Sequence, residues 1–177
     1  MLNKNIYNQV EDGNRFFDSQ ERRDAILLES FNNDVKWFTS LSANTRMSEI
    51  DYKAIDRKGR LVHIELKERE GDIDKYLNQW EYIFIEPSKI QATTKIMESG
   101  HTFDEQRLFI NFVDDGVIIF NLNNISDLKF YPNHKHWNRG KKCYEHEDRF
   151  GLRVKDAIIY KMRYEDGRLE RFKQWES

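Results

Sequence analysis

The sequence predicts a mixed α/β domain, and three observations carry this prediction. Segment 18–33 places Ala25, Leu28 and Phe31 at helical spacing. Apolar and polar residues alternate along residues 61–67, which is typical of a β-strand. Further along, Asp-Gly pairs separate short apolar runs, which is typical of β-hairpins. At 177 residues, one domain spanning residues 1–177 is expected.

The N-terminal half predicts a helix followed by a hairpin. The helix should begin with Asp18 or Ser19 as its N-cap and end near residues 32–33. The stretches "RMSEIDYKAID" and "RLVHIELK" then form two strands around a turn at Gly59, which supplies the positive φ. Next come a short helix in "DIDKYLNQW" and a third strand in "EYIFIE". Pro87 should open a further helix that Gly100 closes.

The C-terminal half predicts more hairpins. The runs "RLFINFV" and "GVIIFNL" flank a turn, and a closing hairpin covers about 154–175. Between them, residues 132–150 are expected to form a polar loop. The expected order is therefore α-β-β-β-α-β-β, then the loop and the closing hairpin, with the core at about 18–121.

Composition limits the classes of function. Hydrophobic residues make up 38% and aromatic residues 14%, which is enough for a folded core. The 29 basic and 31 acidic side chains give a net charge of -2, so a polyanionic partner would have to meet a local basic patch. A single cysteine, Cys143, excludes an intramolecular disulfide framework. The sequence shows neither a signal-peptide pattern nor an apolar run of the roughly 20 residues that span a bilayer, so a reducing cytoplasm is the expected location.

The first hairpin carries a cluster of charged and titratable side chains. His63, Glu65 and Lys67 should share one accessible face of the second strand, with these apolar residues buried behind it: Val62, Ile64 and Leu66. A turn centred on residue 58 places Asp51 opposite Glu65, roughly 5 Å away at Cβ. Two carboxylates this close repel unless a cation lies between them, and Lys67 adds a donor beside them. The cluster predicts a site for a hard metal ion; a solvated face held by cross-strand ion pairs stays open.

In this context the stretch "IDYKAIDRKGRLVHIELK" resembles the PD-(D/E)xK nuclease superfamily, which includes restriction endonucleases, junction resolvases and phage recombination nucleases. The family motif is an Asp, a spacer containing a turn, and Glu-x-Lys preceded by apolar residues. Asp51, Glu65 and Lys67 stand in these places, while Ile50 replaces the Pro before the Asp. The resemblance covers about residues 18–121 and implies a restriction-endonuclease-like α-β-β-β-α-β core with a C-terminal β-hairpin extension.

The resemblance implies a Mg²⁺-dependent DNA endonuclease or junction-resolving nuclease that acts in phage or bacterial DNA processing, with Mn²⁺ as a substitute metal. It implies that Asp51, Glu65 and the backbone carbonyl of Leu66 hold the ion, leaving positions for water and substrate. Lys67 would orient the attacking water or stabilise charge on the phosphate.

Family members often add a Glu from the first helix, and two residues compete for this role. Glu21 shares a helical stripe with Ala25 and Leu28, whereas Glu29 lies about 80° further round the helix. We prefer Glu21 as the additional catalytic acid, although a first-turn acid favoured by the helix dipole explains it equally well. Further along, Arg69 and Lys89 are candidates for contacts with phosphate.

The polar loop supplies the local basic patch that a nearly neutral chain needs to bind DNA. Basic side chains beside an aromatic ring can follow a phosphate backbone and stack on a base. The predicted nucleic-acid-binding residues are Lys135, Trp137, Arg139, Lys141 and Lys142. A mobile solvated loop is the plain alternative. Zinc is a third interpretation, because its ligand spacings are met by His134, His136, Cys143 and His146.

Two other classes of function remain open. One is a non-catalytic module that retains the nuclease fold and binds nucleic acid or a protein; the other is a structural or host-interaction protein of a virus. The complete set of Asp51, Glu65 and Lys67 favours the enzyme, because a binding module has no need for two carboxylates facing a phosphate. The expected partner is DNA, and a homodimer is left open.

Overall fold

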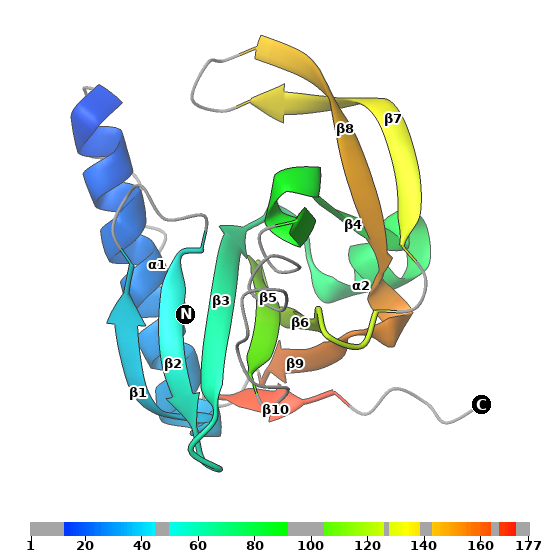
Figure 1. Ribbon diagram of the computed structural model, residues 1–177. Helices are drawn as coiled ribbons and strands as arrows, with labels where there is room; N and C mark the ends of the chain where they lie inside the picture. Colours follow the sequence, from blue (N-terminus) through cyan, green and yellow to red (C-terminus); the bar gives the residue numbers. More distant parts are fainter. Residues whose placement is uncertain are drawn as a thin grey trace.

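The computed structural model describes residues 13–44, 50–91, 105–125, 128–138, 143–163 and 167–172, with side chains described from residue 21 onward except at 137 and 138. Within these ranges, a long helix packs on a seven-stranded sheet, and a three-stranded sheet lies beside it (Figure 1). The larger sheet has the order β1-β2-β3-β5-β6-β9-β10, and the smaller has the order β4-β8-β7. None of the described helices is long and apolar enough to cross a lipid bilayer.

The described elements follow one another along the chain with these bounds: α1 (Gly13–Val35), β1 (Phe38–Ala43), β2 (Tyr52–Asp56), β3 (Leu61–Glu68), α2 (Ile73–Lys75), a π-helical turn (Tyr76–Trp80), β4 (Tyr82–Ile85), β5 (Gln106–Val113), β6 (Gly116–Asn121), β7 (Lys129–Asn138), β8 (Cys143–Arg153), a 3-10 turn (Val154–Asp156), β9 (Ile158–Met162) and β10 (Leu169–Arg171). A helical turn at 87–91 follows β4. The expected helix end at Gly100 lies outside the described residues.

The helix α1 forms because one of its stripes is apolar. Leu27, Leu28 and Phe31 are buried at spacings of one, three and four residues, which places them together against the sheet. The prediction of a helix is confirmed, but the expected start at Asp18 or Ser19 is wrong, since α1 begins at Gly13. A residue that is favoured at N-caps can also lie inside a helix, when the backbone hydrogen bonding of the helix begins before it.

The strand β1 was not expected from the sequence. It follows α1 directly, and Asn32 joins the two elements: its side chain accepts from the Phe38 N–H (2.8 Å) and donates to the Phe38 carbonyl (3.0 Å). β1 pairs antiparallel with β2, and β2 pairs antiparallel with β3 around a turn where Gly59 has φ 79°. Tyr52 pairs with Ile64, which confirms the predicted register centred on residue 58.

Burial on β3 departs from the prediction of an accessible face. Residues 61–68 form the expected strand, and Val62, Ile64 and Leu66 are buried as expected. His63 and Glu65, however, are also buried, with exposed fractions of 4% and 5%. β3 is a central strand that pairs in parallel with β5, and both faces of this part of the sheet are covered by other elements.

Two apolar clusters explain this coverage. The first lies between α1 and the sheet and includes Phe31, Ile64 and Phe112. The second lies on the opposite face and joins β5, β6 and β9 to α2, β4 and β8 through residues such as Ile73 and Ile85. The hairpins β5–β6 and β9–β10 pair as predicted.

The smaller sheet holds two corrections. The segment "EYIFIE" does form a strand, β4, but β4 pairs with β8 instead of joining the strands of the first hairpin. The expected polar loop at 132–150 is wrong, because β7 and β8 form a long antiparallel hairpin there, with an irregular register between Tyr131 and His134. We call β7 and β8 together the arm; it projects beyond the end of the larger sheet (Figure 1). Backbone pairing outweighs the polar composition of this segment.

Arg69 connects the two sheets from just beyond the end of β3. Its Nε donates to Asn111 Oδ1 on β5 (2.6 Å), and one Nη donates to the Phe84 carbonyl on β4 (2.7 Å). The guanidinium also lies 5.6 Å from the centre of the Phe109 ring. Asn111 is fully buried at 0% exposure, so the bond to Arg69 satisfies a polar group that water cannot reach. Arg69 is therefore a structural bridge and not a contact for phosphate.

We predict that Arg69→Ala lowers the free energy of unfolding by about 2–4 kcal/mol, because it leaves Asn111 and the Phe84 carbonyl without a donor. Urea denaturation measures the change. Arg57→Ala, at an exposed turn position, is the matched control and should shift stability by no more than about 0.5 kcal/mol. Equal effects of the two substitutions would contradict the bridging role.

Candidate metal centre

The two carboxylates predicted to face each other do lie at adjoining strand positions. The β2–β3 register pairs Tyr52 with Ile64, so Asp51 and Glu65 occupy the next pair along the hairpin. Asp51 Oδ2 accepts a hydrogen bond from the backbone N–H of Leu66 at 2.8 Å. This bond fixes the Asp51 side chain against β3 and uses one of its carboxylate oxygens.

Glu65 lies between two ammonium groups. Lys67 Nζ is 3.2 Å from Glu65 Oε1, and Lys89 Nζ is 2.8 Å from Oε2. Both Glu65 oxygens are buried, so these two ammonium groups balance a charge that water reaches poorly. Burial raises the pKa of Glu65, and Asp51 adds to this effect, while the nearby ammonium groups of Lys67 and Lys89 oppose it.

A third carboxylate, Asp24 on α1, joins this group. Burial raises the pKa of Asp24 to about 7, and repulsion from Asp51 contributes to the shift. Glu65 repels Asp24 as well, whereas Lys67 attracts it. Asp24 Oδ1 is buried and has no hydrogen-bond partner among the residues that the structure describes. Three acids, from α1, from the residue before β2 and from β3, are therefore within electrostatic range of one another at one end of the sheet.

Asp24 was not among the predicted site residues, although the sequence holds a signal for it. Asp24 precedes Leu27, Leu28 and Phe31 by three, four and seven residues, so it extends the buried stripe of α1 toward the N-terminus. An acid on the buried apolar stripe of a helix is a stronger candidate for a site residue than an acid on the exposed side of the same helix. The predicted residues Glu21 and Glu29 are both exposed.

Lys67 is held as a cation by its acidic neighbours. Burial alone would lower the pKa of Lys67, but attraction to Glu65, Glu86 and Asp51 outweighs it and raises the pKa. Glu86, at the end of β4, shows the reverse effect: burial opposes its ionisation, yet Lys67 and Arg149 lower its pKa. The ammonium of Lys67 thus stays charged beside the three acids.

The chemistry of this group fits a hard divalent cation. Carboxylate oxygens are the ligands that Mg²⁺ and Mn²⁺ prefer. The buried Asp24 Oδ1 has no hydrogen-bond partner in the described part of the chain, whereas the two buried Glu65 oxygens are paired with the Lys67 and Lys89 ammonium groups. A buried carboxylate oxygen without a partner is rare in proteins, and a bound cation would satisfy it.

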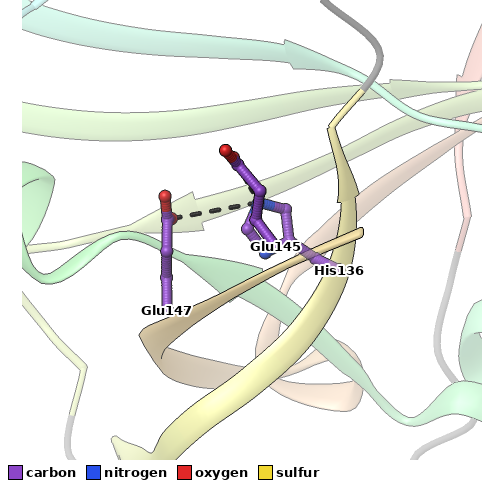
Figure 2. Close-up of side chains that lie close together, drawn as sticks. All are labelled: His136, Glu145 and Glu147. Atoms are coloured by element: carbon purple, nitrogen blue, oxygen red, sulfur yellow. Dashed lines mark ion pairs between the residues drawn. The ribbon is translucent and has the colours of Figure 1, made fainter. Parts of the chain in front are cut away.

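The predicted zinc ligands on the arm do not come together. Cross-strand partners in the arm are His134 with Glu147, His136 with Glu145, and Lys135 with His146. Because side chains alternate between faces, His146 points away from the face that His134 and His136 share. Cys143 is exposed at the end of β8. Instead, the described ligand atoms of His136, Glu145 and Glu147 lie within 4.8 Å of one another (Figure 2).

Arg149 already neutralises this second group. One Nη of Arg149 lies 2.7 Å from Glu147 Oε2 and 3.1 Å from His136 Nε2, so it donates to both atoms that would face a metal. The other Nη lies 2.5 Å from Glu86 Oε1. Arg149 thus takes the place of a cation here and fastens the arm to the end of β4, next to the acid that faces Lys67.

The predicted nucleic-acid-binding residues of the arm are described only in part. Lys135 is exposed, and its ammonium lies 4.4 Å from the centre of the exposed Tyr144 ring across the hairpin. The Trp137 side chain and the basic residues Arg139, Lys141 and Lys142 lie outside the described part. The arm therefore presents a cation and an aromatic ring together on one face, and the binding of nucleic acid by Lys135 stays a prediction.

Comparison with known proteins gives little. No family model matches the chain, and no curated protein matches it. Among solved structures, it is similar to Hjc, a Holliday junction resolvase from the archaeal hyperthermophile Archaeoglobus fulgidus, at 10% sequence identity and a TM-score of 0.47. The similarity covers 78% of this chain and 90% of that chain. A likeness of this strength does not assign a function, so the assignment depends on the geometry of the site.

We predict that Asp24→Asn changes how stability depends on pH when divalent cations are removed with EDTA. The Asp24 carboxyl titrates near 3.8 in the unfolded chain and near 7 in the folded one, so the folded state binds the proton more tightly. Its contribution is fully present below pH 3.8 and is lost as the pH rises through about 7. Asparagine stays neutral, so the variant should be more stable than the wild type at pH 8 by about 2 kcal/mol.

Urea denaturation at several pH values between 4 and 8 measures this difference. Glu29→Gln, an exposed acid on the same helix, is the control and should leave the curve unchanged. Parallel stability curves for Asp24→Asn and the wild type would show that Asp24 is not held in its protonated form.

Proposed function

We propose that this chain is a divalent-metal-dependent nuclease that hydrolyses phosphodiester bonds in DNA, as an endonuclease or junction-resolving enzyme of phage or bacterial DNA processing. The observation that carries the proposal is that Asp24, Asp51 and Glu65 lie within electrostatic range of one another beside the Lys67 ammonium, and that the buried Asp24 Oδ1 has no hydrogen-bond partner among the described residues. Mutually repelling acids at a buried edge are costly for stability and useful for holding a cation.

The residues that would hold Mg²⁺ or Mn²⁺ are Asp51, Glu65 and the backbone carbonyl of Leu66, with Asp24 in place of Glu21 as the acid from the first helix. When bound, the ion supplies a bound water of lowered pKa and offsets negative charge on the phosphate. Asp51 has one oxygen fixed by the Leu66 N–H, which orients the carboxylate before any ligand arrives.

Lys67 carries the role that an ammonium can perform. It is a donor without ligand capacity, so it acts on the attacking water or on the phosphate oxygens and not on the metal. The pairing with Glu65 at 3.2 Å holds it next to the proposed ion. Its raised pKa keeps it protonated at neutral pH, as stabilisation of an anionic transition state requires.

The strand topology supports a restriction-endonuclease-like core. The chain runs through α1, the antiparallel strands β1, β2 and β3, then α2, the π-helical turn and β4 outside the larger sheet, the helical turn at 87–91, and β5 parallel to β3. Without the elements outside the larger sheet, this is the order α-β-β-β-α-β, with β1 as a core strand where "EYIFIE" had been expected. The helical turn contributes Lys89, whose ammonium contacts Glu65.

A non-catalytic DNA- or protein-binding module is the second candidate, and one observation favours it. Both Glu65 oxygens lie beside ammonium groups, so the charge of Glu65 is already balanced within the protein. In a binding module these ion pairs would be permanent. In the enzyme they are exchanged for the cation, and Asp24 loses its proton.

We predict that the protein cleaves at least one of labelled single-stranded, duplex and branched DNA in Mg²⁺ or Mn²⁺, and none of them in EDTA. A binding module would retain DNA without cleaving it under any of these conditions. Cleavage that persists in EDTA would exclude the proposed metal dependence.

We predict separate roles for Asp51 and Lys67. Asp51→Asn should weaken Mn²⁺ binding and lower the single-turnover cleavage rate by at least about 100-fold, while the protein stays folded. Lys67→Ala should bind Mn²⁺ nearly as the wild type does and still lose a similar factor in rate, because an ammonium is not a ligand. Calorimetric titration with Mn²⁺ and single-turnover cleavage distinguish the two. Unchanged Mn²⁺ affinity in Asp51→Asn would show that the ion binds elsewhere.

We propose that the arm, together with residues 139–142 between its strands, binds the DNA backbone. The residues that would do so are Lys135, Trp137, Arg139, Lys141 and Lys142. Replacing the four basic residues by Gln should flatten the slope of log affinity against log salt concentration by roughly 0.9 for each phosphate that the variant no longer neutralises. The control carries four neutralised basic residues on exposed positions away from the arm: Lys36, Lys75, Lys155 and Arg171. Equal slopes for the arm variant and the wild type would remove the arm from the interface.

A further inference from the structure

A small cavity adjoins the proposed metal centre on the side away from Lys67. Its polar lining residues are Glu65, Lys89, His63 and Arg107. His63 and Arg107 are partners in the parallel pairing of β3 with β5, so they project from neighbouring strands onto the same face. Its remaining lining is apolar and consists of Ile50, Leu108 and Leu122.

Arg107 is a buried cation without a partner. Its exposed fraction is 4%, and no hydrogen bond or ion pair to its guanidinium occurs among the described residues. The nearest acid, Glu105, attracts it at longer range, but the Glu105 carboxylate is paired with His63 Nε2 at 2.9 Å. Buried arginines are almost always paired, as Arg149 is here with Glu86. The exception at Arg107 therefore points to a ligand.

The ligand should be an anion with oxygen acceptors. A guanidinium offers fixed N–H donors that match phosphate or carboxylate geometry, and it keeps its charge even when buried. Burial lowers the pKa of Arg107, but an arginine remains protonated throughout the range in which proteins are folded. The cavity has room for about one water-sized group, so it fits a single oxygen atom of an anion whose other atoms stay outside the cavity.

Lys89 connects the cavity with the metal centre. Its ammonium now lies 2.8 Å from Glu65 Oε2, on the wall that Glu65 shares with the cavity. A cation that engages Glu65 would compete with this ion pair, and the Lys89 ammonium would still line the cavity. Arg107 and Lys89 would then present two positive charges to the same oxygen.

We propose that Arg107, together with Lys89, forms a phosphate-binding subsite that takes one non-bridging oxygen of the backbone phosphate next to the cleaved bond. The proposal rests on the proposed nuclease function. To that function the proposal adds a place for a second phosphate, next to the scissile one and lined by Lys89 of the helical turn at 87–91. Recognition of this kind is independent of base sequence and positions the strand for cleavage.

A scan with neutral methylphosphonate linkages tests this subsite. Each phosphate around the cleaved bond is replaced in turn, and DNA affinity is measured in Mg²⁺ with Lys67→Ala, which should bind DNA but cleave it slowly. One position next to the cleaved bond should weaken binding about tenfold, as expected when one charge-assisted hydrogen bond is removed. In Lys67→Ala/Arg107→Gln, the same replacement should have no further effect.

Matched controls separate the subsite from general effects. Arg57→Gln removes an exposed arginine and should keep the full drop in affinity at that position. Arg107→Lys keeps the charge, so the methylphosphonate at that position should still weaken binding in part. This variant replaces Arg107→Gln in the test if Arg107→Gln does not fold. If the sensitive phosphate is the terminal one of a strand, removal of that phosphate alone should reproduce the drop, and the subsite then takes a strand end. An equal drop at every position in both backgrounds would overturn the subsite.

A second readout does not depend on cleavage. In the wild-type protein with Mg²⁺, the Nε–H resonance of Arg107 should shift on titration with inorganic phosphate, and the shift should weaken when Lys89 is replaced by Gln. A protein that shows this shift but cleaves no DNA would retain the subsite and lose the nuclease function. A protein that cleaves DNA while Arg107 is insensitive to phosphate and to the linkage scan would retain the function and lose the subsite.

Discussion

The structure depends on the balance of charge around the Glu65 carboxylate. Glu65 is 5% exposed, and it shares its surroundings with the acids Asp24 and Asp51 and the ammonium groups of Lys67 and Lys89. Burial makes every one of these charges costly unless a partner is close. One acid, Asp24, avoids part of the cost by holding a proton up to about pH 7. These charged side chains therefore stabilise one another only when all of them are present. A divalent cation bound among them would change the ion pairs of every member.

The fold supplies the members of this set from separate elements. The hairpin β2–β3 aligns Asp51 with Glu65, and α1 brings Asp24 to the same edge of the sheet. The helical turn at 87–91 adds Lys89. Glu86, the residue after β4, attracts Lys67 and pairs with Arg149 of the arm. The Glu86–Arg149 pair thus ties the arm to the end of β4, beside the proposed metal centre. Arg149 also donates hydrogen bonds to His136 and Glu147, in the group that these residues form with Glu145.

Local sequence predicted the parts of the site that local rules determine. Period-two alternation identified β3, and the turn at Gly59 fixed the register that pairs the positions of Asp51 and Glu65. Prediction from local sequence failed where contacts between residues far apart in the chain determine the structure. β4 leaves the larger sheet because its partner, β8, lies about 70 residues further along the chain. The arm forms strands despite its polar composition because each provides the other's backbone partners. Asp24 is buried only because α1 packs on strands that follow it.

The most direct test of the central claim is the number of protons released when Mn²⁺ binds, measured calorimetrically at pH 6 in buffers of different ionisation enthalpy. If the ion is held by Asp24, Asp51 and Glu65, binding must displace the proton that Asp24 carries below about pH 7. We expect about one proton per Mn²⁺ at pH 6, close to none at pH 8.5, and none at either pH in Asp24→Asn. Binding of Mn²⁺ without proton release at pH 6, or with equal release in Asp24→Asn, would contradict the proposed centre.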